Sequence, residues 1–416
     1  MRRSEAVGNG LARTALLALL PRLGRGRLEL VERGRTHSFG PADASLRARV
    51  EIRDERAWPS LLRGSLGAGE AYIEGWWDTD DLASAARIVA RNLTPIDRAR
   101  RLVHPLVGPL QRLLARVPAN TLPGARRNIS AHYDLGNELF AAFLDERMVY
   151  SCAYFERPDA DLESAQLAKL ERACRALELR PEDHLLEIGT GWGALAIHAA
   201  SEYGCRVTTT TLSRRQAEHA RARVRELGLE GRINVLERDY RELEGAYDKL
   251  VSIEMIEAVG WQYFPEFFRR CSRLLREDGL MFLQAIVIAD ELYEQEKAAK
   301  SFANTHVFPW GCLPSRRLIR ELVGRVTDLR LAWLDDITEH YPPTLAEWRR
   351  RFEAAFPRLR EHGYDERFRR LWNFYLATSE AGFREGRLGD VQLLFAKPGA
   401  VRAAGTESAA RATVAA

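Results

Sequence analysis

Hydrophobic positions in the second half of the chain follow two repeating patterns. Short apolar runs bounded by glycine or charged residues predict buried strands, and longer segments with apolar residues three or four positions apart predict helices. The predicted strands are 184–188, 206–212, 233–236, 249–253, 280–288, 328–334 and 391–396, and the predicted helices are 162–179, 194–203, 214–227 and 263–275. Because strands that alternate with helices pair in parallel, this region predicts an α/β fold whose sheet carries helices on both faces.

The first half of the chain has a different pattern. Residues 11–20 predict a short basic amphipathic helix, for which membrane contact and ordinary packing are both open. Residues 27–56 alternate as short strands, and residues 58–92 predict helix. Prolines and glycines gather within 104–125, which is typical of a linker. These features predict a smaller N-terminal α+β domain (1–120), an α/β domain (121–398) and a disordered Ala-rich tail (399–416).

Composition is that of a globular protein, since 46% of the 416 residues are hydrophobic and 29% are charged. This excludes collagen-like, wholly disordered and multi-span membrane chains, and no stretch reaches the roughly 20 apolar residues of a spanning helix. The five cysteines are scattered without a CxxC pair, so the sequence predicts neither a disulfide framework nor a metal site. A reducing compartment is the expected location.

Charge is unevenly distributed along the chain. Residues 1–130 carry 22 Arg against 13 acidic residues, a net charge of +9, and the remainder carries −5. Residues 87–127 contain nine Arg and one acid, Asp97. A general preference for Arg over Lys explains why the basic residues are arginines. It does not explain why residues 87–127 contain so few acidic residues. The asymmetry predicts an anionic partner such as a membrane surface, a nucleic acid or a phosphorylated ligand.

A glycine-rich loop follows the first strand of the predicted α/β region. Glu187 lies near the end of this strand, and Gly189, Gly191 and Gly193 form a GxGxG pattern that leads into a helix. Glycines allow a tight turn and the close approach of a ligand at the carboxyl edge of a sheet. The second strand ends at Thr208–Ser213 without the acid that a dinucleotide ribose requires, so S-adenosylmethionine is favoured over a nicotinamide cofactor.

The segment after the second strand has two interpretations. Ser213 and Gln216 have the spacing of a helix capping box, which needs no ligand. In the other interpretation, Thr211 and Gln216 bind the cofactor that the neighbouring glycine loop predicts. The two interpretations do not exclude each other.

Further motifs occur in one consistent order between about Ala125 and Lys397. They are Asn128–Phe140 (NISAHYDLGNELF), Tyr150–Phe155 (YSCAYF), Glu187–Gly193, Thr211–Gln216, Asp239–Arg241, Val251–Gly260 and Phe308–Ser315 (FPWGCLPS). On these motifs the chain resembles the cyclopropane fatty acid synthase family, because general methyltransferases share the glycine loop but not HYDLGN or YSCAYF. The resemblance implies a Rossmann-like class I methyltransferase fold with a mostly parallel seven-stranded sheet. It also implies methyl transfer from S-adenosylmethionine to the cis double bond of an unsaturated phospholipid acyl chain, giving a cyclopropane ring.

The resemblance assigns roles to individual residues. The family's cofactor contacts carry over to Tyr150, Ser151, Gly189, Gly191, Thr211, Gln216, Tyr240 and Arg241, and the glycine loop adds Glu187 and Gly193. A bicarbonate ion that takes the proton released on ring closure would be held by Cys152, Glu257, Ile286 and Tyr341, with Gln284 close by. The chemistry suits these residue types, because methylation of an alkene leaves a carbocation that needs an anion and a base. Cys152 is expected to line the site as a polar, neutral thiol, because the proposed chemistry requires no thiolate.

Two positions depart from the family pattern. Ala258 follows Glu257 where the family has a histidine, and Gln284 stands where a histidine contacts bicarbonate. An amide donates a hydrogen bond but cannot titrate, so the proton can leave from a different carbon. In place of the ring, the proton can also leave as an exocyclic methylene forms, or hydride addition can give a methyl branch. The segment Glu254–Gly260 together with Gln284 is similar to an actinobacterial branch of the family linked to branched products.

Simpler interpretations and rival functions stay open. Tyr341 is equally well explained as a loop aromatic, Glu257 as a helix cap, and Trp76 and Trp77 as core or interface anchors. Rival functions are methylation of a small amine or a lipid headgroup, and non-catalytic lipid binding. No nucleic-acid partner is expected, because the basic N-terminal region contains no recognisable nucleic-acid-binding motif. We expect a cytoplasmic enzyme, peripheral on the inner membrane face; the oligomeric state is open, a homodimer included.

Overall fold

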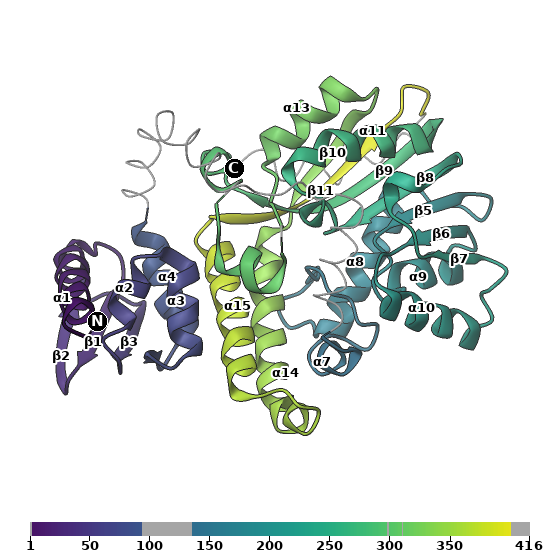
Figure 1. The fold of residues 1–416 in the computed structure, drawn as a ribbon. Helices are drawn as coiled ribbons and strands as arrows, with labels where there is room; N and C mark the ends of the chain where they lie inside the picture. Colours follow the sequence, from purple (N-terminus) through teal and green to yellow (C-terminus); the bar gives the residue numbers. More distant parts are fainter. Residues whose placement is uncertain (1, 94–134, 298, 310, 401–416) are drawn as a thin grey trace. The chain divides into compact units, whose positions relative to one another are not determined.

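The computed structural model describes residues 2–93, 135–297, 299–309 and 311–400 (Figure 1). Most of the arginine-rich segment, the start of the Asn128–Phe140 motif and the tail from residue 401 lie outside these residues. The chain forms two compact units, which we describe separately. The smaller unit comprises Met1–Arg116, Glu294–Pro309 and Leu345–Arg387, and the larger comprises Val117–Tyr293, Trp310–Thr344 and Leu388–Ala416.

The larger unit contains the predicted seven-stranded sheet, with strand order β10-β11-β9-β8-β5-β6-β7. The strands are β5 (His184–Ile188), β6 (Arg206–Thr210), β7 (Ile233–Leu236), β8 (Tyr247–Ile253), β9 (Leu275–Ile288), β10 (Arg330–Asp336) and β11 (Leu388–Ala396). Strands β9, β8, β5, β6 and β7 pair in parallel, whereas β11 is antiparallel to both of its neighbours. The carboxyl ends of β5, β6 and β8 therefore meet at one edge, where an α/β sheet places its ligands.

Helices cover both faces of this sheet (Figure 1). One face carries α8 (Leu162–Ala176), α9 (Ala194–Glu202) and α10 (Arg214–Glu226), and the other carries α11 (Phe264–Leu274) and α13 (Arg316–Val326). Within β9, Leu280 and Phe282 belong to the first of these two cores, and Met281 and Leu283 belong to the second. Successive strand residues point to opposite faces, so a strand that is buried on both faces has a continuous apolar sequence.

Helix starts in the larger unit are fixed by polar side chains. The Asp161 carboxylate accepts from the backbone N–H of Ser164 at the start of α8, and the Ser315 hydroxyl accepts from Leu318 N–H at the start of α13. Each cap of this kind stabilises a helix by about 1 kcal/mol. The short helix α7 (Asn137–Ala141) begins at a glycine instead.

The smaller unit combines a four-stranded sheet with helices. The sheet order is β2-β1-β3-β4, and α15 packs on α3 and α4. Its strands are β1 (Arg27–Glu32), β2 (Arg35–Phe39), β3 (Arg47–Ile52) and β4 (Trp77–Thr79), and its helices are α1 (Arg2–Leu19), α2 (Ala57–Leu61), α3 (Gly64–Ile73), α4 (Leu82–Asn92), α12 (Tyr293–Glu296), α14 (Tyr341–Glu361) and α15 (Glu366–Arg384). Helices α12 and α14 begin on residues that belong to the larger unit.

Aromatic side chains form the centre of the smaller unit. Trp77 is buried, lies 5.1 Å from Tyr72 and 6.4 Å from Phe374 between ring centroids, and donates its indole N–H to the Ala68 carbonyl. Trp77 is therefore a core residue. Trp76 is half-buried beneath the Arg56 guanidinium.

The smaller unit departs from three expectations. The segment 58–92 is not continuously helical, because β4 pairs with β3 in its middle. The expected continuous domains 1–120 and 121–398 differ from the observed units, because residues 294–309 and 345–387 pack with the N-terminal region. Two of the nine arginines in 87–127, Arg87 and Arg91, bind Glu385 at 2.8 and 2.5 Å, so they are already paired.

Within the described residues, no helix has both the length and the apolar character needed to cross a membrane.

Candidate active site

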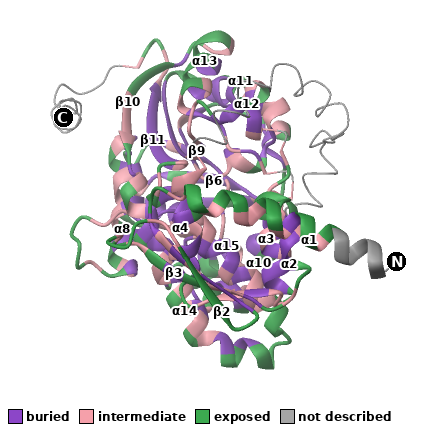
Figure 2. Ribbon diagram, turned by 90° about the vertical axis from the view of Figure 1, so that its left-hand side faces the viewer, coloured by how far each residue is buried: buried purple, intermediate pink, exposed green. Residues whose placement is uncertain are grey.

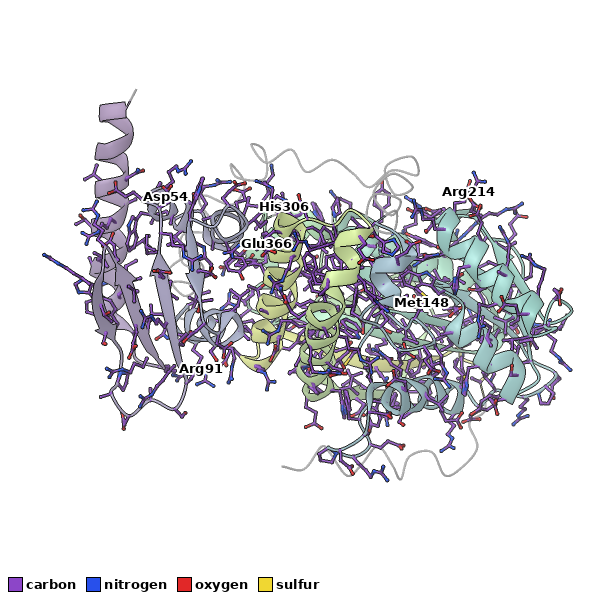
Figure 3. All side chains as sticks on the ribbon, turned by 90° about the horizontal axis from the view of Figure 1, so that it is seen from below. Asp54, Arg91, Met148, Arg214, His306 and Glu366 are labelled. Carbon is purple, nitrogen blue, oxygen red and sulfur yellow. The ribbon has the colours of Figure 1, made fainter. Side chains whose placement is uncertain are left out.

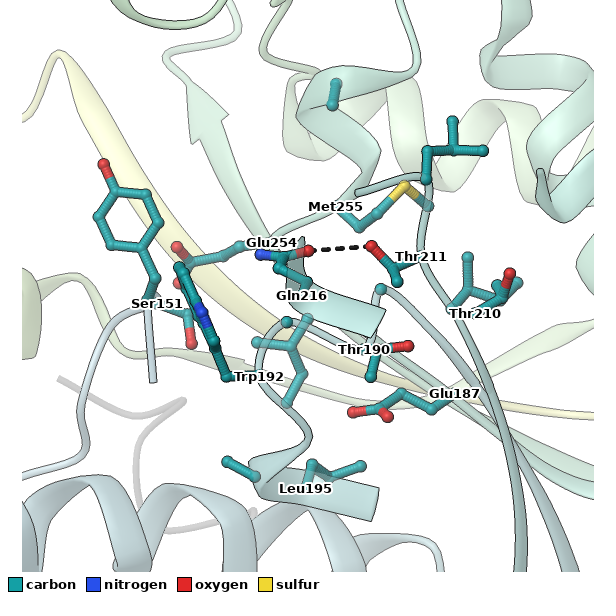
Figure 4. A pocket seen from close by; sticks show the side chains of 18 of the residues that line it. Ser151, Glu187, Thr190, Trp192, Leu195, Thr210, Thr211, Gln216, Glu254 and Met255 are labelled. Carbon is teal, nitrogen blue, oxygen red and sulfur yellow. Dashed lines mark hydrogen bonds between the residues drawn. The ribbon is translucent and has the colours of Figure 1, made fainter. Parts of the chain in front are cut away.

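The glycine loop after β5 forms part of the wall of a pocket in the larger unit (Figure 4). Gly189 has a φ of +105°, and a β-carbon at this position would lie 3.2 Å from Met255 Cγ. The N–H groups of Gly189 and Thr190 each donate to the Thr210 carbonyl at 3.0 Å. The loop is thus anchored to the end of β6, and only glycine fits its turn and its close approach to Met255.

Nine of the ten expected cofactor residues line this pocket. They are Tyr150, Ser151, Glu187, Gly189, Gly191, Thr211, Gln216, Tyr240 and Arg241. Gly193 is placed elsewhere: it precedes α9 with a φ of +96°, and a β-carbon there would lie 3.2 Å from Ala220 Cβ. Its small size serves the packing of α9 against α10 and not the wall of the pocket.

Thr211 and Gln216 are joined by a hydrogen bond at the pocket (Figure 4). Thr211 Oγ1 donates to Gln216 Oε1 at 2.9 Å, and Ser213 N–H donates to Thr211 Oγ1 at 3.1 Å. The Ser213 hydroxyl accepts from Gln216 N–H at 3.3 Å. Half of the predicted capping box therefore forms, while the Gln216 side chain turns to the pocket. Arg214, which follows the cap, lies at the outer surface (Figure 3).

An ion pair stands at another part of the pocket wall. The Arg241 guanidinium binds the buried Asp239 carboxylate at 2.8 Å and lies over the Tyr263 ring, 5.1 Å from its centroid. Burial raises the pKa of Tyr240. Because Asp239 neutralises Arg241, this wall presents polar groups without a net charge.

Two ionisable side chains of the pocket are buried. Burial raises the pKa of Glu187 to about 8, and a hydrogen bond from Thr209 Oγ1 at 2.5 Å offsets this only in part. Lys169, which the sequence analysis missed, donates to Ser151 Oγ at 2.5 Å, and burial lowers its pKa. The available signal was its place on the apolar face of the predicted helix 162–179, beside Leu170.

Glu254 accepts hydrogen bonds from three of the five expected catalytic residues. Its Oε1 accepts from the Cys152 backbone N–H and from Gln284 Nε2, both at 2.8 Å, and its Oε2 accepts from the Tyr341 hydroxyl at 2.6 Å. Glu254 also lines the cofactor pocket. Glu254 was not among the site residues expected from the sequence, although an acid directly after β8 was the available signal.

The orientation of the Gln284 amide follows from a chain of hydrogen bonds. Arg172 Nε only donates, so the group that it meets at 2.6 Å is Gln392 Oε1. Gln392 Nε2 therefore faces Gln284 Oε1 at 3.0 Å. This leaves Gln284 Nε2 to donate to Glu254 and, at 3.0 Å, to Asp390 Oδ2. Gln284 is thus a fixed donor to two carboxyl groups.

The other two expected catalytic residues form a second contact. Glu257 Oε1 accepts from Ile286 N–H at 2.6 Å, and burial beside Glu254 raises the pKa of Glu257 to about 8. Burial likewise raises the pKa of Asp390 and that of the Cys152 thiol. Both acids therefore favour their neutral forms, and so does the Cys152 thiol.

Sequence and structure comparisons place the chain in one group of proteins. The family described as mycolic acid cyclopropane synthetase matches residues 121–393. A tuberculostearic acid methyltransferase of Mycobacterium tuberculosis is 37% identical over 344 residues, which cover 81% of this chain and 80% of that protein. The cyclopropane-fatty-acyl-phospholipid synthase of Escherichia coli K12 is 34% identical over 371 residues, 89% of this chain and 92% of that protein.

A solved structure adds the fold and the cofactor. The mycolic acid cyclopropane synthase complexed with SAH and CTAB has a TM-score of 0.61 and 31% identity, covering 65% of this chain and 98% of its own. The larger unit thus has the class I methyltransferase fold, and its pocket holds residues suited to S-adenosylmethionine. The chain belongs to the mycolic acid cyclopropane synthetase family and is an S-adenosylmethionine-dependent, lipid-modifying methyltransferase of the cyclopropane synthase type.

Proposed function

We propose that this enzyme methylates the cis double bond of an unsaturated acyl chain carried by a phospholipid and that a cyclopropane ring is its product. The observation that carries the proposal is the carboxyl cluster at the cofactor pocket, where Glu254 is bound by three donors and adjoins two buried acids. Methylation of an alkene creates positive charge and releases a proton, so it needs an anion in dry surroundings. Methylation of an amine or a headgroup needs no such cluster.

The residues of the pocket prepare this reaction. S-adenosylmethionine supplies an electrophilic methyl group on a positively charged sulfur. Glu187 offers a carboxylate for the cationic cofactor, and Trp192, which is 3% exposed, helps to exclude water. Holding both reactants in line compensates for the weak nucleophilicity of an alkene. Neutral Glu257 and Asp390 add no second negative charge beside Glu254.

A second product is favoured by the amide of Gln284. This amide is locked as a donor to Glu254 and cannot shuttle a proton as a histidine does. Direct loss of a proton from the transferred methyl group closes the cyclopropane ring. Loss of the methyl proton after a 1,2-hydride shift between the two former alkene carbons gives instead an exocyclic methylene, which is isomeric with the cyclopropane. A saturated methyl branch requires a hydride donor in addition. The name of the tuberculostearic acid methyltransferase makes both alternatives worth testing.

Helix α1 supports access to a membrane surface (Figure 2). Its inner side is fixed by Arg13, which binds the Glu32 carboxylate at 2.7 Å. The outer side exposes Leu11 (69%) and Leu19 (44%) eight positions apart, with the basic Arg22 exposed beyond the helix. An exposed apolar stripe beside a basic residue favours binding to an anionic lipid surface, because the leucines can enter the lipid while Arg22 contacts the headgroups. On this proposal the enzyme works from the cytoplasm on the inner membrane face, and a homodimer stays an open expectation.

Labelled methyl transfer tests the proposed reaction. The purified enzyme is incubated with methyl-labelled S-adenosylmethionine and vesicles of a monounsaturated phospholipid. After hydrolysis, we expect the label in the acyl chain, and NMR then separates cyclopropane from methylene. Label in the headgroup or in a water-soluble product would contradict acyl-chain methylation. Vesicles of saturated phospholipid are the control and should remain unlabelled.

A further inference from the structure

We propose that Glu254 is a built-in catalytic carboxylate, which occupies the place that the family resemblance assigns to a bicarbonate ion and accepts the proton released by the reaction. This inference rests on the proposed methylation of an acyl-chain double bond. It assigns the catalytic base to the protein itself, so that turnover needs no added anion.

The expected bicarbonate cradle is already occupied by side-chain carboxyl groups. Cys152 N–H and the Tyr341 hydroxyl both donate to Glu254, at 2.8 and 2.6 Å. Ile286 N–H donates to Glu257 at 2.6 Å. The three donors that were expected to hold the ion, Cys152 N–H, Ile286 N–H and the Tyr341 hydroxyl, thus each have a carboxyl oxygen within hydrogen-bond distance. The residues present do not fit a further anion, and they do fit the carboxylate of Glu254.

The backbone at Glu254 has the conformation expected of a specially placed residue. Its φ is +47°, in the left-handed region that a glutamate rarely adopts. Such a conformation costs of order 1 kcal/mol and persists only where the surroundings impose it. Here the Glu254 N–H donates to the Gln284 carbonyl at 2.9 Å, while the side chain is held by three donors. Both contacts direct the carboxylate into the pocket wall.

The donors around Glu254 match an ionised carboxylate. A backbone N–H, a phenol and an amide NH₂ converge on its two oxygens, and the amide orientation is fixed from Arg172 through Gln392. Two donors engage Oε1 and Tyr341 engages Oε2, and Asp390 forms a further side-chain hydrogen bond with Glu254. The two lone pairs of Oε2 let it take a proton while it accepts from Tyr341. Burial raises the pKa of Glu257 and that of Asp390, so both of these neighbouring acids favour their neutral forms.

The proposed step balances without another reactant. The π electrons of the alkene form a C–C bond to the transferred methyl carbon, and the C–S bond breaks with its electron pair on sulfur. The carbocation that remains loses a proton to Glu254 Oε2. The electrons of the broken C–H bond of the transferred methyl group close the ring. If a 1,2-hydride shift first moves the positive charge to the methylated carbon, the same electrons form the methylene. Glu254 becomes a neutral carboxylic acid and returns its proton to solvent after the product leaves.

The dependence of the wild-type enzyme on bicarbonate is the first test. Turnover on monounsaturated phospholipid vesicles is measured in CO₂-depleted buffer and again after bicarbonate is added. We expect the two rates to agree within about 20%, a margin far below the effect of losing a catalytic base. A wild-type rate that collapses on depletion and returns with bicarbonate overturns the proposal.

Two variants make the test specific to Glu254. Glu254→Gln keeps the shape but not the charge, and we expect kcat to fall about 10²-fold or more, with no recovery in bicarbonate. Glu254→Gly suits the positive φ and empties the cradle, so we expect bicarbonate to restore part of its lost activity. Binding of ¹³C-labelled bicarbonate, followed by NMR, should appear in Glu254→Gly and not in the wild type. Wild-type turnover in Glu254→Gln overturns the proposal.

Controls separate this proposal from the proposed function. Glu277→Gln, an exposed change at the far end of β9, should leave turnover unchanged. Calorimetric binding of S-adenosylhomocysteine shows that each variant is folded. If the wild type methylates no acyl chain at all, the proposed function fails. If it does so but needs bicarbonate, only the role of Glu254 fails.

Discussion

At the scale of a single residue, the proposed cofactor contact of Glu187 predicts that cofactor binding is linked to protonation. Without cofactor its pKa is raised to about 8 by burial, so the carboxyl is mostly neutral at pH 7. A cationic cofactor favours the ionised form, and binding below pH 8 must therefore release a proton. We expect the Kd for S-adenosylmethionine to fall as pH rises from 6 to 8, by up to about tenfold per pH unit, and then to level off. Calorimetry across this range measures it.

The variant Glu187→Gln isolates this effect from titration of the cofactor itself. Its amide oxygen still accepts from Thr209, but the residue cannot ionise. We expect weaker binding at pH 8 and a flatter pH profile than in the wild type. Equal slopes in the two proteins would show that Glu187 does not carry the linked proton.

Glu257 affects stability in the direction opposite to that of a salt-bridged acid. Its folded pKa of about 8 lies above the ordinary value of 4.5, so the folded state binds more protons than the unfolded state between these pH values. Its contribution to stability is therefore full below about pH 4.5 and is lost as pH rises through 8. We expect Tm of the wild type to fall relative to that of Glu257→Gln between pH 5 and 8. Scanning calorimetry at several pH values checks this, and a constant Tm difference would refute it.

Residue-level prediction succeeded where the chemistry is local in the sequence. The glycine loop, Thr211 and Gln216 follow strand ends, so their place on a pocket was predictable from the order of strands and loops. Glu254 was missed because its importance comes from donors more than 80 positions away, such as Cys152 and Tyr341. The hydrogen-bond path from Arg172 to Gln284 joins α8, β11 and β9, and no local pattern encodes such a path.

At the scale of elements, all seven strands of the larger unit were predicted, with ends that differ from the observed ones by up to five residues. His184–Ile188 and Ile233–Leu236 match the prediction at both ends, because a charged residue precedes each run and a glycine or a charged residue follows it. Strand β4 was missed, since only three residues form it and its existence depends on pairing with β3. Short strands defined by a distant partner carry no periodic signal of their own.

Two glycines in helical settings should respond in opposite ways to the same substitution. Gly193 begins α9 at a φ of +96° with Ala220 close by, whereas Gly324 lies exposed inside α13 with no atom within 4 Å of an added β-carbon. We expect Gly193→Ala to destabilise by about 1–3 kcal/mol and Gly324→Ala to stabilise by about 0.5–1 kcal/mol. Urea denaturation with a common m-value measures both. A stabilising Gly193→Ala would show that the α9 start relaxes freely.

At the scale of the whole molecule, chain order is a poor guide to domain membership. Residues 345–387 belong to the smaller unit although β11 of the larger unit follows them. Arg370 binds Asp78, and its guanidinium lies 3.9 Å from the Tyr72 ring centroid. Glu385 similarly pairs with Arg87 and Arg91 of α4. These ion pairs join segments nearly 300 positions apart, so a boundary drawn from the Pro-rich linker alone does not find them.

The proposed attachment to a lipid surface also concerns the whole molecule, and α1 gives this proposal a testable location. Leu11 and Leu19 expose an apolar stripe, so Leu11→Glu combined with Leu19→Glu adds two negative charges where lipid contact is proposed. We expect sedimentation with anionic vesicles to fall about tenfold or more, because burial of each leucine contributes about 1.5–3 kcal/mol. The control matched in charge is Leu227→Glu combined with Leu331→Glu in the larger unit, where the two leucines are 48% and 38% exposed. Equal losses of vesicle binding in both proteins would assign the effect to net charge and remove α1 from the membrane contact.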